Sequence, residues 1–184
     1  MRPLSPRDLT RGRDAGWCLR ANRWGEWNAV RHFFAVISRL GDGVFWYTLM
    51  AVLVIADGYA GLAASAHLAA TGAIALLLYK GLKRWTRRPR PFASDVRIRA
   101  WIAPLDEFSF PSGHTLHAVA FSIVAVAHYP MLATILLPFT ACVALSRVVL
   151  GLHYPSDVLA AIGIGSALAA TSLWMASALQ GFAM

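Results

Sequence analysis

Charged residues are scarce in this sequence. They make up 14% of its 184 residues, whereas hydrophobic residues make up 58%. Soluble domains contain roughly 25% charged and about 45–50% apolar residues, so this composition excludes a disordered chain and argues against an ordinary soluble globule. Acidic residues are fewer than basic ones: the sequence has 9 Asp and Glu and 17 Lys and Arg, which gives a net charge of +8. Such an excess suits nucleic acid, an anionic membrane surface or a phosphate substrate.

Cysteine is also rare, which excludes one class of secreted protein. Two cysteines, Cys18 and Cys142, cannot make the disulfide framework of a small extracellular domain. The basic N-terminus has no apolar core followed by a cleavage site, so we expect no secretory signal peptide. The sequence also contains no internal repeat and no cluster of residues spaced as metal ligands.

Long stretches without charge are present instead. Residues 62–79, 108–145 and 158–184 contain no Asp, Glu, Lys or Arg, and residues 44–61 contain only Asp57. A bilayer span needs about 20 mainly apolar residues, so the longest stretch suits two spans with a turn near Pro130. We therefore predict five spans, at about 43–61, 62–80, 113–129, 131–149 and 156–179, with a turn at Gly58 and Gly61. The expected fold is all-α, a polytopic membrane helix bundle, and it favours the membrane over nucleic acid as the partner of the positive charge.

The first 41 residues have a different character, because they contain eight arginines. Apolar residues recur at three- and four-residue spacing between Trp24 and Leu40, which predicts an amphipathic helix. We expect this helix to lie in the membrane interface with its tryptophans at headgroup level. The alternative is a helix packed on the end of the bundle. The chain thus divides into a basic arm, residues 1–41, and a membrane domain, residues 42–184.

Three polar segments stand out beside the spans. They cover residues 83–91, 110–114 and 146–157, and the five-span topology places all three on one side of the membrane. Each has an ordinary explanation on its own: a basic run that anchors headgroups, a serine N-cap, and a helix-start acid favoured by the helix dipole. Their coincidence on one side favours a shared site.

The residue types in these segments suit phosphate. Lys83, Arg90 and Arg147 supply three cations that can bind phosphate oxygens. Ser112 and Gly113 lie where a helix is expected to begin, so free backbone N–H groups and the positive end of the helix dipole meet at the same place.

Two histidines in these segments suit phosphoryl transfer. His153 is followed four residues later by Asp157, and a carboxylate bonded to one ring nitrogen leaves the other nitrogen unprotonated, as a nucleophile requires. His114 has no acid nearby in the sequence, which suits a proton donor.

The three segments together resemble the type 2 phosphatidic acid phosphatase superfamily, which also includes the soluble vanadium haloperoxidases. The family pattern is K-x6-R-P, then P-S-G-H, then S-R-x5-H-x3-D, and residues 83–157 match it at every fixed position. The resemblance implies that His153 attacks phosphorus and forms a phosphohistidine, that Asp157 orients His153, and that His114 protonates the leaving oxygen and then activates water. It implies phosphoryl-binding roles for Lys83, Arg90, Ser112, Gly113 and Arg147, and it requires no metal or other cofactor. Larger membrane members have an extra N-terminal span, and we expect the basic arm to take its place here.

The predicted function is therefore that of an integral membrane lipid phosphatase. The substrate is expected to be a phosphomonoester or pyrophosphate on a lipid: phosphatidic acid, phosphatidylglycerophosphate, undecaprenyl pyrophosphate or a lipid A phosphate. The motif residues are expected to contact only the phosphate group, so they do not distinguish among these four lipids. Three alternatives stay open: a lipid phosphotransferase that uses the same histidine, a vanadium haloperoxidase, against which the five spans argue, and a non-catalytic membrane protein that binds anionic lipids. The expected partners are the phosphorylated lipid and membrane lipids, with no nucleic acid, and the oligomeric state is left open.

Two arguments disagree about which side of the membrane holds the site. All the Lys and Arg residues lie on the side of the three segments, so the positive-inside rule places that side in the cytoplasm. The resemblance places it in the periplasm, because bacterial membrane members usually face that compartment. We expect a multi-pass protein of the bacterial inner (cytoplasmic) membrane, and of the two sides we favour the periplasm.

Overall fold

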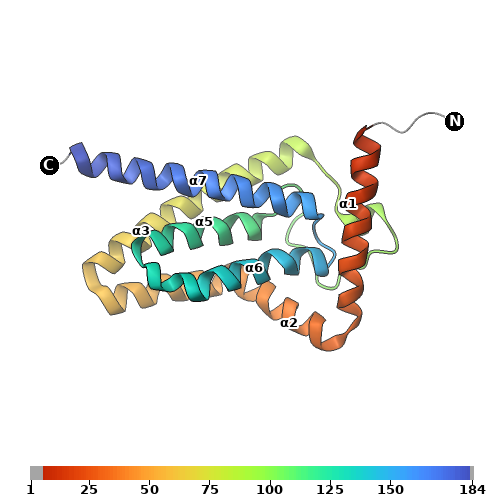
Figure 1. Ribbon diagram of the computed structural model, residues 1–184, viewed down its shortest axis with the longest axis horizontal. Coiled ribbons are helices and arrows are strands. Elements are labelled where there is room, and N and C mark those ends of the chain that lie inside the picture. The colour runs from red at the N-terminus through yellow and green to blue at the C-terminus, as the bar shows by residue number, and fades with distance from the viewer. Residues whose placement is uncertain (1–5, 183–184) are drawn as a thin grey trace.

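The computed structural model describes residues 6–182, with side chains described for residues 12–179. The first five residues of the predicted arm and the last two of the membrane domain lie outside this range. Within it every regular element is helical, which confirms the all-α prediction. The elements are α1 (Pro6–Asn22), η1 (Arg23–Glu26), α2 (Asn28–Arg39), η2 (Leu40–Val44), α3 (Phe45–Thr86), α4 (Pro91–Ser94), α5 (Gly113–His128), η3 (Pro130–Leu132), α6 (Ala133–Val149) and α7 (Pro155–Phe182). Figure 1 shows α5, α6 and α7 side by side, with α1 lying across one end of the bundle.

The first two predicted spans form one hairpin, α3, which reverses at Gly58 (Figure 1). Gly58 has a φ of 52°, a left-handed value that interrupts a helix and that glycine adopts without steric cost. The two halves then pack closely, because a Cβ at Gly61 would lie 1.9 Å from the carbonyl oxygen of Leu53. The hydroxyl of Ser65 donates to the carbonyl of Met50 over 3.0 Å. These contacts confirm the predicted turn.

The other three spans agree with the prediction to within a few residues. In the described part of the chain, three helical stretches are long and apolar enough to cross a membrane: Asn28–Ser94, Pro130–Val149 and Pro155–Leu179. The first contains α3, which folds back and so contributes two spans. α5 is apolar but only 16 residues long. Together these helices make the five spans of a membrane helix bundle, as predicted.

α5 occupies the centre of the bundle. Ala118, Ala120, Val124 and Ala125 on this helix are each fully buried, so apolar neighbours surround it on several sides. Neighbouring helices approach it through glycines: a Cβ at Gly165 of α7 would lie 2.8 Å from a carbonyl oxygen of α5. Because α5 begins in the middle of the bundle, its N-terminal residues are brought close to the ends of α3 and α6.

The N-terminal arm contains two helices rather than the single one predicted. α1 was not expected, because the sequence pattern of residues 6–22 has no strong apolar face. α2 buries Phe34 and Ser38 and packs against α6. This face of the helix therefore packs on the bundle, which was the alternative to an interfacial position. Trp24 and Trp27 remain exposed, at 59% and 74%, and their position at the headgroups stays a prediction. The boundary proposed at residues 41 and 42 falls inside η2.

Candidate active site

The three polar segments meet at one end of the bundle and line a single cavity of about 810 Å³. Six of the eight predicted site residues contribute to its wall: Lys83, Arg90, Gly113, His114, Arg147 and His153. The other two, Ser112 and Asp157, are fully buried, and the Ser112 N–H donates to the Asp157 carbonyl over 3.4 Å. The eight residues come from the end of α3, the loop before α4, the N-cap and start of α5, the end of α6, the loop between α6 and α7, and the start of α7. The structure thus brings the predicted residues together.

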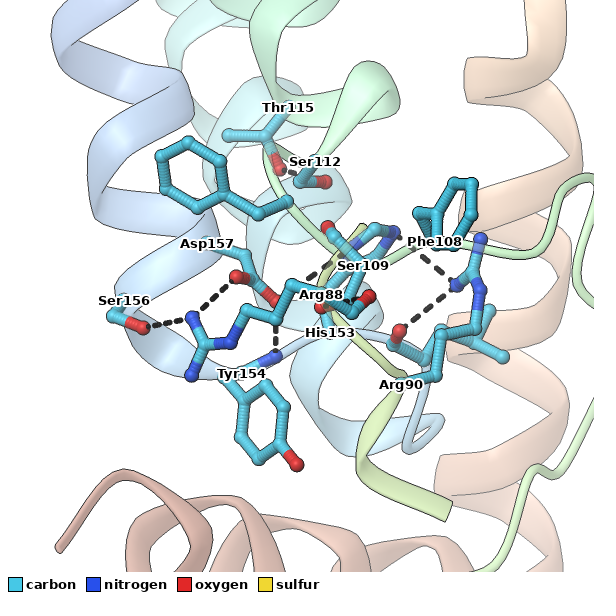
Figure 2. A network of polar contacts seen from close by, with 12 residues as sticks. Arg88, Arg90, Phe108, Ser109, Ser112, Thr115, His153, Tyr154, Ser156 and Asp157 are labelled. Carbon is cyan, nitrogen blue, oxygen red and sulfur yellow. Dashed lines mark hydrogen bonds and ion pairs between the residues drawn. The ribbon is translucent and has the colours of Figure 1, made fainter. Parts of the chain in front are cut away.

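His153 is held with one ring nitrogen toward a backbone carbonyl and the other toward the cations. Its Nδ1 lies 2.6 Å from the carbonyl oxygen of Ser109 (Figure 2). A carbonyl can only accept, so Nδ1 carries the proton and Nε2 keeps its lone pair. Nε2 lies 3.5 Å from Nη1 of Arg90. Burial, reinforced by the positive charges of Arg147, Arg90 and Lys83, lowers the pKa of His153 well below its ordinary value, so the ring is neutral near pH 7.

Asp157 does not make the direct bond to His153 that its spacing predicts. Its Oδ2 lies 3.8 Å from Nδ1 of His153, beyond a hydrogen bond, and accepts instead the N–H of Tyr154 over 2.9 Å. The place at Nδ1 is taken by the Ser109 carbonyl. A main-chain carbonyl carries no residue-type signal, so sequence reasoning could not find this partner. Asp157 therefore anchors the backbone of the His153 loop rather than its ring.

Arg88 and Asp14 complete the support of Asp157, and sequence reasoning missed both. Arg88 donates to Asp157 Oδ1 from Nη1 and to Asp14 Oδ2 from Nη2, each over 2.6 Å. Its guanidinium also lies 4.2 Å from the ring centroid of Tyr154 (Figure 2). Arg88 lies in a basic run in which nothing distinguishes it from Arg87. These bonds link the arm, through α1, to the loop that carries His153.

The Asp106 carboxylate forms ion pairs with two of the residues predicted to bind phosphate, Lys83 and Arg90. Lys83 Nζ lies 2.6 and 2.7 Å from the two carboxylate oxygens, and Arg90 Nη2 lies 2.8 Å from Oδ1. Burial alone raises the pKa of Asp106, but the bonds from Lys83 and Arg90 outweigh it and hold the pKa below its ordinary value. Both cations are almost fully buried, whereas the Asp106 side chain is 39% exposed. A carboxylate thus lies where two oxygens of a phosphate are expected.

Arg147 has an unused donor. The residue is 2% exposed, and its Nη1 donates to the hydroxyl of Ser38. Its Nε is buried and has no hydrogen-bond partner among the described residues. A buried cation whose donor is unused is costly until an anion binds it. The geometry of Arg147 therefore suits its predicted role as a phosphate ligand.

His114 has an acid beside it after all. Its Nε2 contacts Oδ1 of Asp42, which comes from η2 and lies 72 positions earlier in the chain. Sequence reasoning found no such partner because it considered only acids close in the sequence. Both side chains are largely buried, and both line the cavity.

The cavity continues from its polar end into an apolar part. One face of the second half of α3 lines it with residues at three- and four-residue spacing: Ala69, Gly72, Ala73, Leu76, Tyr79 and Lys83. The small members of this set leave room, and Trp46 and Met50 from the first half of the hairpin close the opposite wall. The charged end and the apolar body thus belong to one continuous space, which suits an amphiphile.

Comparison with known proteins agrees with the motifs. The PAP2 superfamily matches residues 60–180. Phosphatidylglycerophosphatase B of Escherichia coli (strain K12) is 37% identical over 79 residues, 40% of this chain and 31% of that protein. The protein of the same name from Bacillus subtilis (strain 168) is 37% identical over 101 residues, 48% of this chain and 46% of that protein. The chain therefore spans less than half the length of these two relatives.

A solved structure shares the fold over most of the chain. The crystal structure of a transmembrane PAP2-type phosphatidylglycerolphosphate phosphatase from Bacillus subtilis superposes with a TM-score of 0.75 and 24% sequence identity. The superposition covers 92% of this chain and 87% of that one. This protein is thus an integral membrane helix bundle with the same fold. Since the family match covers more than half of the sequence and includes every motif residue, the chain belongs to the PAP2 superfamily.

Proposed function

We propose that this protein is a membrane phosphatase that removes a phosphate or pyrophosphate group from a lipid. The observation that carries the proposal is the continuity of the cavity. Its polar end contains His153 with three buried cations, and its apolar body lies between the halves of α3. A soluble phosphate ester would have no use for the apolar part. The names of the relatives, phosphatidylglycerophosphatase B, support the same class of substrate.

The proposed reaction has two steps. In the first, the lone pair on Nε2 of His153 attacks phosphorus, the bond to the leaving oxygen breaks, and that oxygen takes a proton from His114. In the second, water attacks the phosphohistidine and gives its proton to His114. The phosphorus–nitrogen bond breaks and its electron pair returns to Nε2.

The phosphate-binding groups act by stabilising charge. Lys83, Arg90 and Arg147 neutralise the phosphoryl oxygens, and the free N–H groups at the start of α5, near Ser112 and Gly113, add donors. The desolvated cations interact more strongly with a phosphate than they would in water. We infer that the reaction needs no metal ion, because these groups already meet the charge that a metal would neutralise.

Which lipid is the substrate is a narrower question. The names of the two relatives favour phosphatidylglycerophosphate over the other three candidates. A lipid phosphotransferase remains the second candidate, because a phosphohistidine can pass its phosphoryl group to another lipid as well as to water.

The test is a substrate panel on the purified protein in detergent. We expect inorganic phosphate to be released from at least one of phosphatidylglycerophosphate, phosphatidic acid, undecaprenyl pyrophosphate and a lipid A phosphate. The activity should survive EDTA, and vanadate should inhibit it by occupying the phosphoryl site. Release from none of the four would contradict the proposal. Label from the substrate phosphate found in a second lipid would favour the phosphotransferase.

We further propose that the protein lies in the bacterial inner membrane with its cavity open to the periplasm. Ser94 is exposed at the end of α4, on the side of the membrane that holds the site, so Ser94→Cys can report that side. In a background with Cys18 and Cys142 replaced by alanine, a membrane-impermeant thiol reagent should label this cysteine in intact spheroplasts. Labelling only after lysis would place the site in the cytoplasm, as the positive-inside rule predicts.

A further inference from the structure

We propose that Asp42 is the positioning residue of the proton donor His114. The inference rests on the proposed phosphatase activity and adds a residue that belongs to none of the three motifs. It starts from the contact between Oδ1 of Asp42 and Nε2 of His114.

The backbone around Asp42 is shaped to bring the carboxylate to this place. Gly43 has a φ of 134°, a value outside the range of other residues, and it breaks the helix between α2 and α3. Gly41 lies close to α6, since a Cβ there would make a tight contact of 3.2 Å with Val143 and would lie 3.9 Å from the His114 ring. The glycines on both sides thus let the backbone approach α5 and α6 closely while only Asp42 extends a side chain.

The contact assigns different tasks to the two ring nitrogens of His114. A carboxylate at Nε2 holds the ring orientation and stabilises the protonated ring. Among the described residues the structure shows no hydrogen bond to the other nitrogen, Nδ1. We therefore assign proton exchange with the substrate to Nδ1: it gives its proton to the leaving oxygen in the first step and takes one from water in the second. Nε2 keeps its proton on the Asp42 side in both steps.

A second role for Asp42 makes a different prediction. Arg147 also lines the cavity, so the Asp42 carboxylate faces the same space as this cation. If Asp42 acted only through Arg147, its loss would change the binding of every phosphate substrate equally. If it acts through His114, its loss matters only where the leaving oxygen needs a proton. The leaving group therefore separates the two roles.

The experiment compares two substrates of the wild-type protein and of Asp42→Asn. Phosphatidic acid has an alkoxide leaving group that needs a proton, whereas the nitrophenolate of p-nitrophenyl phosphate leaves without one. We expect kcat on phosphatidic acid to fall by about 10²-fold, the low end of the range for general acid catalysis, with KM nearly unchanged. Single-turnover release of nitrophenolate and the inhibition constant of vanadate should stay close to wild type.

Two further variants serve as rescue and control. Asp42→Glu keeps the charge and should recover part of the lost kcat on phosphatidic acid. If the asparagine variant does not fold, Asp42→Glu is compared with wild type on the same two substrates, and its remaining loss of kcat should again be confined to phosphatidic acid. Asp57→Asn makes the same change of acid to amide at the other end of the bundle, where Asp57 accepts a bond from Tyr129 over 2.7 Å, and should match wild type on both substrates.

The outcomes that overturn the inference are distinct from those that overturn the function. Equal losses on both substrates, a rise in KM with kcat kept, or wild-type behaviour of Asp42→Asn would each exclude the positioning role. A wild-type protein that releases phosphate from none of the four lipids of the substrate panel would overturn the proposed activity itself.

Discussion

The two ends of the bundle differ in how deeply their polar side chains are buried. At the cavity end Lys83, Arg90, Arg147, His153 and Asp157 are buried, and all are held by hydrogen bonds or ion pairs. At the other end, the pair of Asp57 and Tyr129 and the pair of His67 and His128 are exposed. Burial of a charge is costly unless it is paired, so a fold retains such a cluster where it has a use. The difference marks the cavity end as the candidate site without reference to any motif.

The largest expected effect is that of His153→Ala. Activity on lipid phosphates should disappear, because His153 is the group whose free lone pair faces the cations. Phosphate release by the purified variant measures it. The matched control is His128→Ala at the other end, which should keep wild-type turnover. If the two alanine variants were equally active, the contrast between the ends would have no functional meaning.

The next effect is that of His114→Ala. Removal of a general acid should reduce kcat on an alkyl phosphate by about 10²–10⁴-fold, while the phosphohistidine can still form with a good leaving group. Acid quench after mixing with labelled substrate would trap the phosphorylated protein and measure its rate of formation. An undiminished kcat on phosphatidic acid would show that the proton comes from elsewhere.

A smaller effect, on stability, is expected for Arg88→Met. This change leaves the fully buried Asp157 without its ion pair, which costs about 3 kcal/mol in comparable buried pairs and should lower the melting temperature. Arg97→Gln is the control, because it breaks a pair with Asp95 on an exposed loop and should leave the melting temperature almost unchanged. Equal shifts for the two variants would contradict the idea that burial sets the importance of a charge at this end.

The smallest effect concerns binding, in Asp106→Asn. Since the Asp106 carboxylate occupies Lys83 and Arg90, a substrate phosphate has to displace it. Removal of the charge should lower KM by up to about tenfold, the equivalent of about 1.4 kcal/mol. Steady-state kinetics on a short-chain lipid phosphate measures it. A higher KM would mean that Asp106 serves to hold the two cations in place.

Most of the fold and the motif residues were predictable from the sequence, for two physical reasons. Spans depend on local apolar content, so the five-helix bundle and the turn at Gly58 followed from composition and spacing. The motif residues are identifiable because their types and intervals are specific. The supporting partners were not predictable: Asp42 and Asp14 lie 72 and 74 positions from the residues they contact, and Ser109 acts through its carbonyl. The helix α1 was missed because it lies across the bundle end and lacks a strong amphipathic pattern.

The bridge from Asp14 through Arg88 to Asp157 has a thermodynamic consequence. It joins the docking of α1 and the ordering of the loop that carries His153 into one linked equilibrium. Linkage is reciprocal, so an anion that favours the ordered loop must also favour the docked arm by the same free energy. Conversely, lipids or forces that detach α1 from the bundle end lower the population of competent sites. The arginine-rich arm is thereby a point at which contact with the membrane surface would bear on the ordering of the loop that carries His153.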